Sequence, residues 1–327
     1  MKKDNINAKP ILQSILPQDD AFHASKKFFT SEWWYFEAIF NNGYSAVIGF
    51  TKSSKKNFLS YPAIEIYKDG KLQVRAIERY LFQNFQISKN FPFVKLLDDN
   101  VIEFDHGRFN DLGEWVYNIA LKIDNQEVNL KFKGTTPGWK IESEEVGLWT
   151  VALPKATVTG NIVVNGKSMN VNGIGYHDHN WINRNLSTVM NLQCWYWGKI
   201  MSETLTLTWA NIVKKTSKGE FLAVLNQDNK GFFNIKPENI YFKPDNYIRN
   251  HGRKMPTSYT LKINDVVNDI PIHVDVDMEV KNIHRRFKRL LIAPYWRYLV
   301  ETKGFLNIGS YKEKVNKNQI MELFHLI

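Results

Sequence analysis

The chain has 327 residues, of which 43% are hydrophobic and 23% are charged, so it has the composition of a globular protein and the length of two domains. Its first residues are polar and no apolar run is long enough to cross a bilayer, so we expect neither a secretory signal nor a transmembrane helix. The single cysteine, Cys194, excludes an internal disulfide and fits a cytoplasmic protein.

The formal charge of +10 is concentrated in the second half of the chain. Residues 1–181 hold 21 Lys and Arg against 20 Asp and Glu, whereas residues 182–327 hold 22 against 13. The densest basic cluster is residues 284–291. A solvated face is the simplest interpretation, and peripheral contact with an anionic membrane surface is the main alternative. No nucleic-acid-binding motif accompanies the charge, so we expect no nucleic acid partner.

Strand and hairpin signals recur along the chain. Asn-Gly and Asp-Gly pairs suit two-residue hairpin turns, and several lie beside apolar or alternating segments. No long amphipathic helix stands out. The pattern therefore predicts an all-β fold of antiparallel strands, closed into barrels or folded as sandwiches. The clearest expected strands, in chain order, are residues 44–50, 64–67, 118–123, 157–164 and 272–277.

An aromatic motif occurs twice, about half a chain apart. Residues 32–38 read Glu-Trp-Trp-Tyr-Phe-Glu-Ala, and 161 positions later residues 193–199 read Gln-Cys-Trp-Tyr-Trp-Gly-Lys. A repeat at half the chain length predicts two duplicated domains rather than a solenoid. We expect an N-terminal barrel over residues 1–185 and a strongly basic C-terminal barrel over residues 186–327.

The two halves also end alike. The segment from Gly160 to Asp178 is similar to the segment from Gly304 to Glu322, which makes Glu322 the repeat counterpart of Asp178. We interpret Glu322 as a remnant with a structural role. The first Trp of the second aromatic motif, Trp195, is expected in a barrel core.

The densest group of reactive side chains is Gly-Ile-Gly-Tyr-His-Asp-His-Asn-Trp at residues 173–181. On an extended segment, Tyr176, Asp178 and Asn180 share one face, and the two histidines share the other. If the first face lines an apolar cavity, Asp178 loses solvation, its pKa rises and it can donate a proton to a substrate. The alternative is that Asp178 satisfies backbone N–H groups at a turn or braces the domain junction.

His177 and His179 raise the possibility of a metal site, because a His-x-His pair places two imidazoles on one face. Zinc needs further ligands, and the sequence has neither an HExxH motif nor a cysteine pair. His106, beside Asp105, could supply one, but nothing in the sequence brings it near. We expect no metal, and hydrogen bonds from these histidines across the domain junction.

Three segments carry a resemblance to a known family: residues 32–38, residues 149–154 (Trp-Thr-Val-Ala-Leu-Pro) and residues 173–181. They resemble the AttH-like group of lipocalin-fold proteins. That group includes the carotenoid 1,2-hydratases, also called hydroxyneurosporene synthases, and more distantly the fungal Diels–Alderases. The resemblance covers about residues 30–325. It implies two lipocalin-like barrels packed together, with an apolar substrate between or inside them.

The resemblance also implies residue roles. In the hydratases, an Asp two positions after a Tyr protonates an isoprenoid double bond, and Tyr176 and Asp178 match that pair. Trp149 matches a Trp of the family, whereas Gly147 stands where the hydratases have a His. This departure leaves open whether hydration itself is retained.

Asp178 and Tyr176 are therefore the expected catalytic residues. No Rossmann or Walker glycine pattern is present, so we expect no cofactor. Three functions remain open: acid-assisted hydration or cyclisation of a C=C bond in an isoprenoid or polyene, non-catalytic carriage of a hydrophobic molecule, and a Diels–Alderase-like pericyclic reaction guided by pocket shape. The expected substrate-binding residues are Trp149, Trp34, Tyr35, His177, His179 and Asn180.

Overall fold

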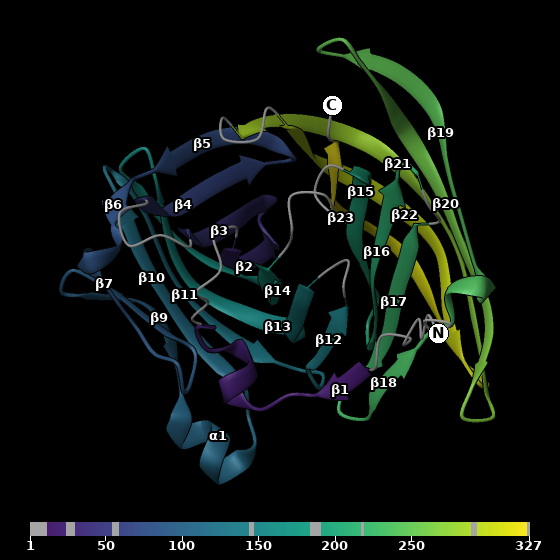
Figure 1. The fold of residues 1–327 in the computed structure, drawn as a ribbon, viewed down its shortest axis with the longest axis horizontal. Helices are drawn as coiled ribbons and strands as arrows, with labels where there is room; N and C mark the ends of the chain where they lie inside the picture. Colours follow the sequence, from purple (N-terminus) through teal and green to yellow (C-terminus); the bar gives the residue numbers. More distant parts are fainter. Residues whose placement is uncertain are drawn as a thin grey trace, which may run out of the picture.

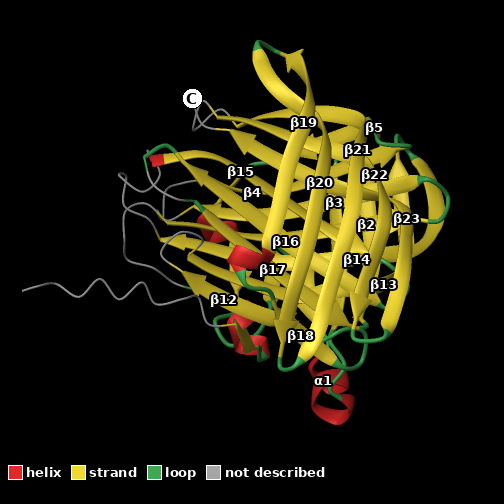
Figure 2. Ribbon diagram, turned by 90° about the vertical axis from the view of Figure 1, so that its right-hand side faces the viewer, coloured by secondary structure: helices red, strands yellow, loops and turns green. Residues whose placement is uncertain are grey.

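The structure is a computed structural model that describes residues 12–23, 30–53, 59–143, 147–183, 191–216, 219–288 and 293–325. Most of these residues form antiparallel strands (Figure 2). Figure 1 shows two strongly curved sheets side by side, one from the purple-to-teal first half and one from the green-to-yellow second half. The all-β, lipocalin-like fold expected from the sequence is confirmed.

The first sheet contains 14 strands within the described residues, in the order β5-β4-β3-β2-β14-β13-β11-β10-β9-β8-β7, with β6 paired to β4 and β12 joining β1 to β13. Its strands are β1 (Leu12–Ser14), β2 (Thr30–Phe40), β3 (Tyr44–Ser53), β4 (Leu59–Lys68), β5 (Lys71–Ile77), β6 (Tyr80–Leu81), β7 (Phe85–Ile87), β8 (Phe93–Leu96), β9 (Asp99–Phe104), β10 (Val116–Ile123), β11 (Gln126–Gly134), β12 (Trp139–Ser143), β13 (Gly147–Val164) and β14 (Lys167–Asn183).

The second sheet contains nine strands in the described part of the chain, in the order β18-β17-β16-β15-β23-β22-β21-β20-β19. Its strands are β15 (Leu192–Met201), β16 (Leu205–Lys214), β17 (Glu220–Gln227), β18 (Gly231–Asn234), β19 (Ile240–Asn250), β20 (Arg253–Val267), β21 (Ile270–Lys288), β22 (Ala293–Ile308) and β23 (Tyr311–His325). The expected domain boundary at residues 185 and 186 falls outside the described residues and stays a prediction.

Helices are few and short in the part of the chain that the structure describes. The α-helix α1 (His106–Leu112) begins after Asp105, whose carboxylate accepts from the Arg108 backbone N–H. Three short 3-10 helices complete the set: η1 (Pro17–Asp20), η2 (Phe82–Asn84) and η3 (Pro237–Asn239). η1 matters most here, because it carries Asp20 into the first sheet's interior.

The five expected strands lie within β3, β4, β10, β13 and β21. The hairpin turns also occur at the positions that the sequence predicts. Asp69 and Gly70 both have positive φ (50° and 75°) between β4 and β5. Asn165 and Gly166, between β13 and β14, also have positive φ, at 51° and 78°. Positive φ at both central residues is the requirement that makes Asn-Gly and Asp-Gly favourable.

Each sheet encloses its own hydrophobic core, and a third cluster lies between the sheets. The first core includes Trp34 and Phe36 of β2, and the second includes Trp209 and Trp296. The third joins residues of both halves: Trp139, Ile141, Trp149, Val151, Tyr176, Trp197, Met201, Ala210, Leu222 and Val224. Burial of this shared apolar surface holds the two sheets against each other.

The two aromatic motifs are equivalent, but not in the alignment that places Trp195 161 positions after Trp34. Trp34 is 1% exposed and packs in the first core, whereas Trp195 packs in the clusters between the sheets. Because strand neighbours face opposite ways, a shift by one residue reverses every side chain. A spacing of 162 restores the match, since it aligns Tyr35 with Trp197 and Glu37 with Lys199, all at the contact between the halves.

Two glycines bend equivalent long strands. Gly160 in β13 has φ of 151° and Gly304 in β22 has φ of 144°. A Cβ atom at Gly160 would lie 2.1 Å from the backbone oxygen of Asn129, and one at Gly304 would lie 2.0 Å from that of Asp275. Both positions therefore require glycine for close approach of a neighbouring strand. Their equivalence agrees with the repeat seen in the sequence.

No helix among the described residues is long and apolar enough to span a membrane. The basic cluster at residues 284–291 falls mostly outside what the structure describes, since residues 289–292 and the side chains of residues 286–288 are not placed. His284 contacts Tyr67 of the first half, with ring centroids 5.8 Å apart. Membrane contact through this cluster stays a prediction.

Candidate functional site

A pocket of about 130 Å³ lies between the two sheets, with walls from β2, β3, β4, β13 and β14 of the first half and β15, β16, β22 and β23 of the second. Half of its lining residues are aromatic, and the wall contains two carboxylates, Asp178 and Glu322, beside the amide of Asn180. The tryptophans of the wall are Trp33, Trp34, Trp149, Trp195 and Trp197. The tyrosines are Tyr35, Tyr61 and Tyr295.

β14 presents Asp178 to this pocket. The strand lies between β13 and β2, so its two faces point to different layers. Tyr176 belongs to the cluster between the sheets, and Asp178 and Asn180 line the pocket. His177 and His179 face the other way. The alternation predicted from the sequence is confirmed.

Three side chains hold the Asp178 carboxylate. Its Oδ2 accepts from the Tyr176 hydroxyl at 2.8 Å and from the Trp149 indole N–H at 2.9 Å. Its Oδ1 accepts from the Asn180 amide at 3.1 Å. These contacts fix the orientation of a carboxyl group that is only 4% exposed.

Burial of Asp178 raises its pKa to about 6, against the lowering effect of the hydrogen bonds from Trp149 and Tyr176 and of the nearby His177 and His179. The direction expected from the sequence is therefore found. A pKa near 6 leaves roughly a tenth of the carboxyl groups protonated at pH 7. The acid form, which has a proton to donate, therefore gains population as the pH falls.

Tyr176 donates to Asp178 from outside the pocket, since Tyr176 is fully buried and is not part of the pocket wall among the described residues. Burial, followed by the charge of Asp178, raises its pKa well above the usual value for tyrosine, so it stays a neutral donor. Its ring packs against Trp197, with centroids 5.3 Å apart. Tyr176 therefore orients the acid and does not itself reach the pocket.

The expected substrate-binding residues divide into two groups. Trp149, Trp34, Tyr35 and Asn180 line the pocket, although Trp34 is largely a core residue that stacks on His179 at 4.2 Å. The structure places His177 and His179 elsewhere, on the opposite face of β14.

The two histidines form an ionic network inside the first half rather than across the domain junction. His177 Nε2 lies 2.9 Å from Asp20 Oδ2, and His179 Nε2 lies 2.9 Å from Glu32 Oε1. The Tyr117 hydroxyl also donates to Asp20, at 2.7 Å. The expectation of hydrogen bonds across the junction is wrong, because η1 brings Asp20 into this position, and no local pattern in the sequence indicates that contact.

Protonation states follow from these contacts. Burial alone would lower the pKa of His179, but its hydrogen bonds with Asp20 and Glu32 raise it to about 9. Burial alone would raise the pKa of Asp20, but His177 and His179 bring it well below the usual value. His179 is therefore an imidazolium at neutral pH, held between two carboxylates.

His23, Glu32 and His179 place potential metal-ligand atoms within 4.8 Å of one another. The Glu32 carboxylate already accepts from the His23 backbone N–H at 2.7 Å and meets His179 at 2.9 Å. His179 Nε2 already pairs with Glu32, and the expectation of no metal stays a prediction. We interpret the cluster as an ion network. His106 lies apart from it, against Phe91 and Phe104.

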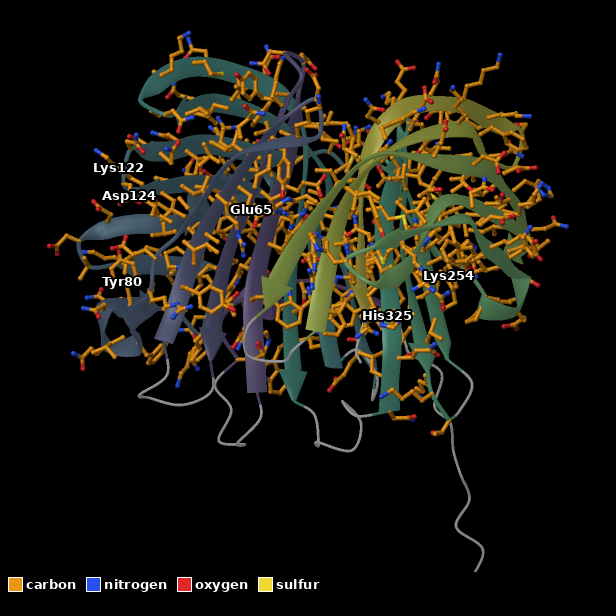
Figure 3. All side chains as sticks on the ribbon, turned by 90° about the horizontal axis from the view of Figure 1, so that it is seen from above. Glu65, Tyr80, Lys122, Asp124, Lys254 and His325 are labelled. Atoms are coloured by element: carbon orange, nitrogen blue, oxygen red, sulfur yellow. The ribbon has the colours of Figure 1, made fainter. Side chains whose placement is uncertain are left out.

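A second network of buried charges joins the halves beside the pocket. Glu37 pairs with Lys199, and the Arg297 guanidinium contacts Glu65 and Glu322. The Tyr35 hydroxyl links the two pairs, since it donates to Glu37 at 3.0 Å and to Glu322 at 3.2 Å. Figure 3 labels Glu65 near the centre of the view, where the strands of the two halves meet.

Gly147, at the position where the carotenoid 1,2-hydratases that the sequence resembles have a His, lies at the start of β13 with φ of 75°. This left-handed conformation favours glycine over a side chain such as imidazole. Trp149, two residues later, reaches the same pocket face as Asp178. The indole therefore contacts the acid without a histidine beside it.

Sequence reasoning missed the contribution of the second half to the pocket. Trp195, expected in a core, and Trp197 both line it, as do Tyr295 and Glu322. The repeat could have indicated this contribution, because duplicated halves that pack about a common axis bring equivalent residues together. The one-residue error in aligning the repeat concealed it.

No family model matches the chain. It is 27% identical to the quinolone epoxide rearrangement protein penF of Penicillium thymicola over 116 residues, 34% of this chain and 32% of that protein. It is 25% identical to asqO of Emericella nidulans, a protein of the same description, over 145 residues, 43% of this chain and 39% of that protein. The matches thus span about a third of the length of these relatives.

Several solved structures share the fold. An AttH protein of Nitrosomonas europaea superposes with a TM-score of 0.68 at 17% identity, covering 96% of this chain and 98% of that chain. CghA with bound Sch210972 gives 0.64 at 11% identity, covering 91% and 88%. Kievitone hydratase of Nectria haematococca gives 0.63 at 11% identity, covering 95% and 93%. These similarities establish the lipocalin-like fold over nearly the whole chain.

Proposed function

We propose that this chain is an enzyme that binds an apolar small molecule in the pocket between its two sheets and protonates it with Asp178. The observation that supports this most is a carboxyl group, 4% exposed, in a pocket wall that is otherwise mostly aromatic. Such a wall binds an apolar substrate and excludes water from the reacting atoms. A carboxyl group in such surroundings can supply general-acid catalysis.

The hydrogen bonds indicate which oxygen carries the proton. Oδ2 already accepts two donors, from Tyr176 and Trp149, so the proton of the neutral acid belongs on Oδ1. Transfer to an epoxide oxygen breaks a C–O bond, whose electron pair stays on that oxygen, and leaves a carbocation. Transfer to an alkene carbon uses the π electrons for the new C–H bond and also leaves a carbocation. The two donors on Oδ2 stabilise the carboxylate that remains.

The carbocation can react further in two ways, and each returns a proton so that the overall reaction balances. The Asp178 carboxylate can take a proton from the adjacent carbon, which restores the acid and gives an isomer. Water can instead add to the cation and return a proton, which gives a hydrate. The indoles of Trp149 and Trp195 can stabilise the cation through cation–π attraction while it exists.

The substrate class is the least constrained part of the proposal. An isoprenoid alkene agrees with the resemblance to the carotenoid 1,2-hydratases. A quinolone epoxide agrees with the descriptions of penF and asqO, and hydration agrees with the name kievitone hydratase. A pocket of about 130 Å³ is small, so we expect a compact substrate or the end group of a longer one.

The test is turnover of a quinolone epoxide, kievitone and an acyclic carotene, followed by mass spectrometry, with wild type and the variant Asp178→Asn. An isomer keeps the substrate mass and a hydrate gains one water, so the product identifies the reaction. We expect Asp178→Asn to lower turnover by at least about 100-fold while the probe still binds, because the amide cannot donate the proton.

The matched control is Asp265→Asn, which alters an equally buried Asp (3% exposed) that accepts from the Lys236 backbone N–H and the Asn239 amide. Among the described residues, Asp265 is not part of the pocket wall. Its turnover should stay near that of the wild type. Full turnover by Asp178→Asn would contradict the acid role and would favour a pericyclic reaction guided by shape. Binding without turnover of any probe by the wild type would favour a carrier.

A further inference from the structure

Glu322 is a second carboxylate in the pocket wall, and it comes from the second half of the chain. In the first half, Asp178 of β14 pairs with Tyr35 of β2. In the second half, Glu322 of β23 pairs with Trp197 of β15, and Trp197 is the equivalent of Tyr35. The duplication therefore brings two equivalent acidic positions to one pocket, from opposite sides of the contact between the sheets.

The surroundings of the two carboxylates differ. Asp178 is held by neutral donors alone, whereas Glu322 Oε1 accepts from Arg297 Nε at 2.9 Å and lies 2.8 Å from Arg297 Nη2. Glu322 is 6% exposed and Arg297 is 3% exposed, so water screens this pair little. A guanidinium at these distances keeps a carboxylate ionised. Paired acidic groups whose environments separate their charge states can take different chemical roles.

We propose that Glu322 is the anionic group of the pocket that faces a positive charge on the bound molecule. The inference rests on the proposed function, in which that charge is the carbocation formed when Asp178 gives up its proton. Glu322 forms no bond and accepts no proton in this role. It stabilises the cation through space, together with the aromatic wall. Arg297, which is not part of the pocket wall among the described residues, pairs with it and keeps it ionised.

The same arrangement would recognise a stable cation of similar shape. Indole and phenol faces around a carboxylate form the kind of site that binds quaternary ammonium groups. Binding of such a cation reports on Glu322 without any chemical step, so it can be measured whether or not a substrate is known.

Glu37 is the matched control for Glu322. It also accepts from the Tyr35 hydroxyl and also pairs with a buried cation of the second half, Lys199. Among the described residues, however, Glu37 is not part of the pocket wall. If Glu322 only braced the two halves, Glu37→Gln and Glu322→Gln should have the same effect on the preference for a cationic ligand.

The experiment compares two probes by calorimetry: benzyltrimethylammonium and its uncharged isostere neopentylbenzene. We expect the wild type to prefer the cation by about tenfold or more, because Glu322 lies in a poorly screened pocket. Glu322→Gln should lose most of this preference, and Glu37→Gln should keep it even if its melting temperature falls. Equal preference in the wild type and Glu322→Gln, or no preference in the wild type, overturns the inference.

Failure of the proposed function gives a different result. If Asp178→Asn keeps full turnover, the acid role is wrong, but the cation preference of the wild type and its loss in Glu322→Gln would still stand. If the acid role holds, Glu322→Gln should lower kcat by about tenfold or more with a smaller change in KM, since the charge it faces exists only after proton transfer. Glu37→Gln should not show this selective loss of kcat relative to KM.

Discussion

Replacing Trp149 with Phe should raise the pKa of Asp178. The change removes the indole N–H that donates to Asp178 Oδ2 at 2.9 Å and keeps an aromatic ring in the pocket wall. A hydrogen bond to a charged group contributes about 1.5–3 kcal/mol, and 1.36 kcal/mol corresponds to one pKa unit. The pKa of Asp178, now about 6, should therefore rise by about 1 to 2. The protonated fraction at pH 7 would then rise from roughly a tenth to between about half and nine tenths.

The assay is a titration of the carboxyl groups by infrared spectroscopy or by NMR of ¹³C-labelled Asp, with Asp178→Asn to assign the signal. The control is Trp139→Phe, since Trp139 packs on Trp149 at 5.2 Å but donates to Asn226. We expect no change in the pKa of Asp178 in that control. An unchanged or lower pKa in Trp149→Phe would refute the reasoning, because it would mean that the indole does not stabilise the ionised form.

Three further predictions concern stability. Burial raises the pKa of Asp178 from 3.8 to about 6, so its contribution to stability is fully present well below pH 4 and is lost as the pH rises through 6. Denaturant unfolding of the wild type relative to Asp178→Asn should therefore show a loss of roughly 2 kcal/mol between pH 4 and 7. The raised pKa of His179, from 6.5 to about 9, contributes stability that is present below pH 6.5 and lost as the pH rises through 9, and a matched titration of His179→Gln should lack this loss. Gly160→Ala should lower the melting temperature markedly, since its Cβ would meet the Asn129 backbone oxygen at 2.1 Å, and an unchanged melting temperature would contradict the close approach.

The sequence predicted the features that depend on local pattern. Alternation in the segment 173–181 placed Tyr176, Asp178 and Asn180 on one face, and the structure agrees. Turn chemistry placed the hairpins at Asp69 and Asn165, because positive φ is a property of those residues and their neighbouring glycines. Such inferences need only neighbours along the chain.

Features that depend on packing between distant segments were not predictable in the same way. The partner of His177 is Asp20, which is 157 residues away and reaches it through η1. The pocket combines strands from both halves, and its second carboxylate, Glu322, was interpreted as structural. A single-residue error in aligning the repeat was enough to reverse the faces of β15, since side chains in a strand alternate.

The proposed function depends on proton donation by Asp178. The pH dependence of the single-turnover rate constant tests this acid role most directly. With any probe that the wild type converts, the rate constant should be nearly constant below pH 5 and should fall about tenfold per pH unit well above the pKa of Asp178, which is about 6. A rate constant that rises with pH, or that does not change between pH 5 and 8, would contradict the claim that this buried acid starts the reaction.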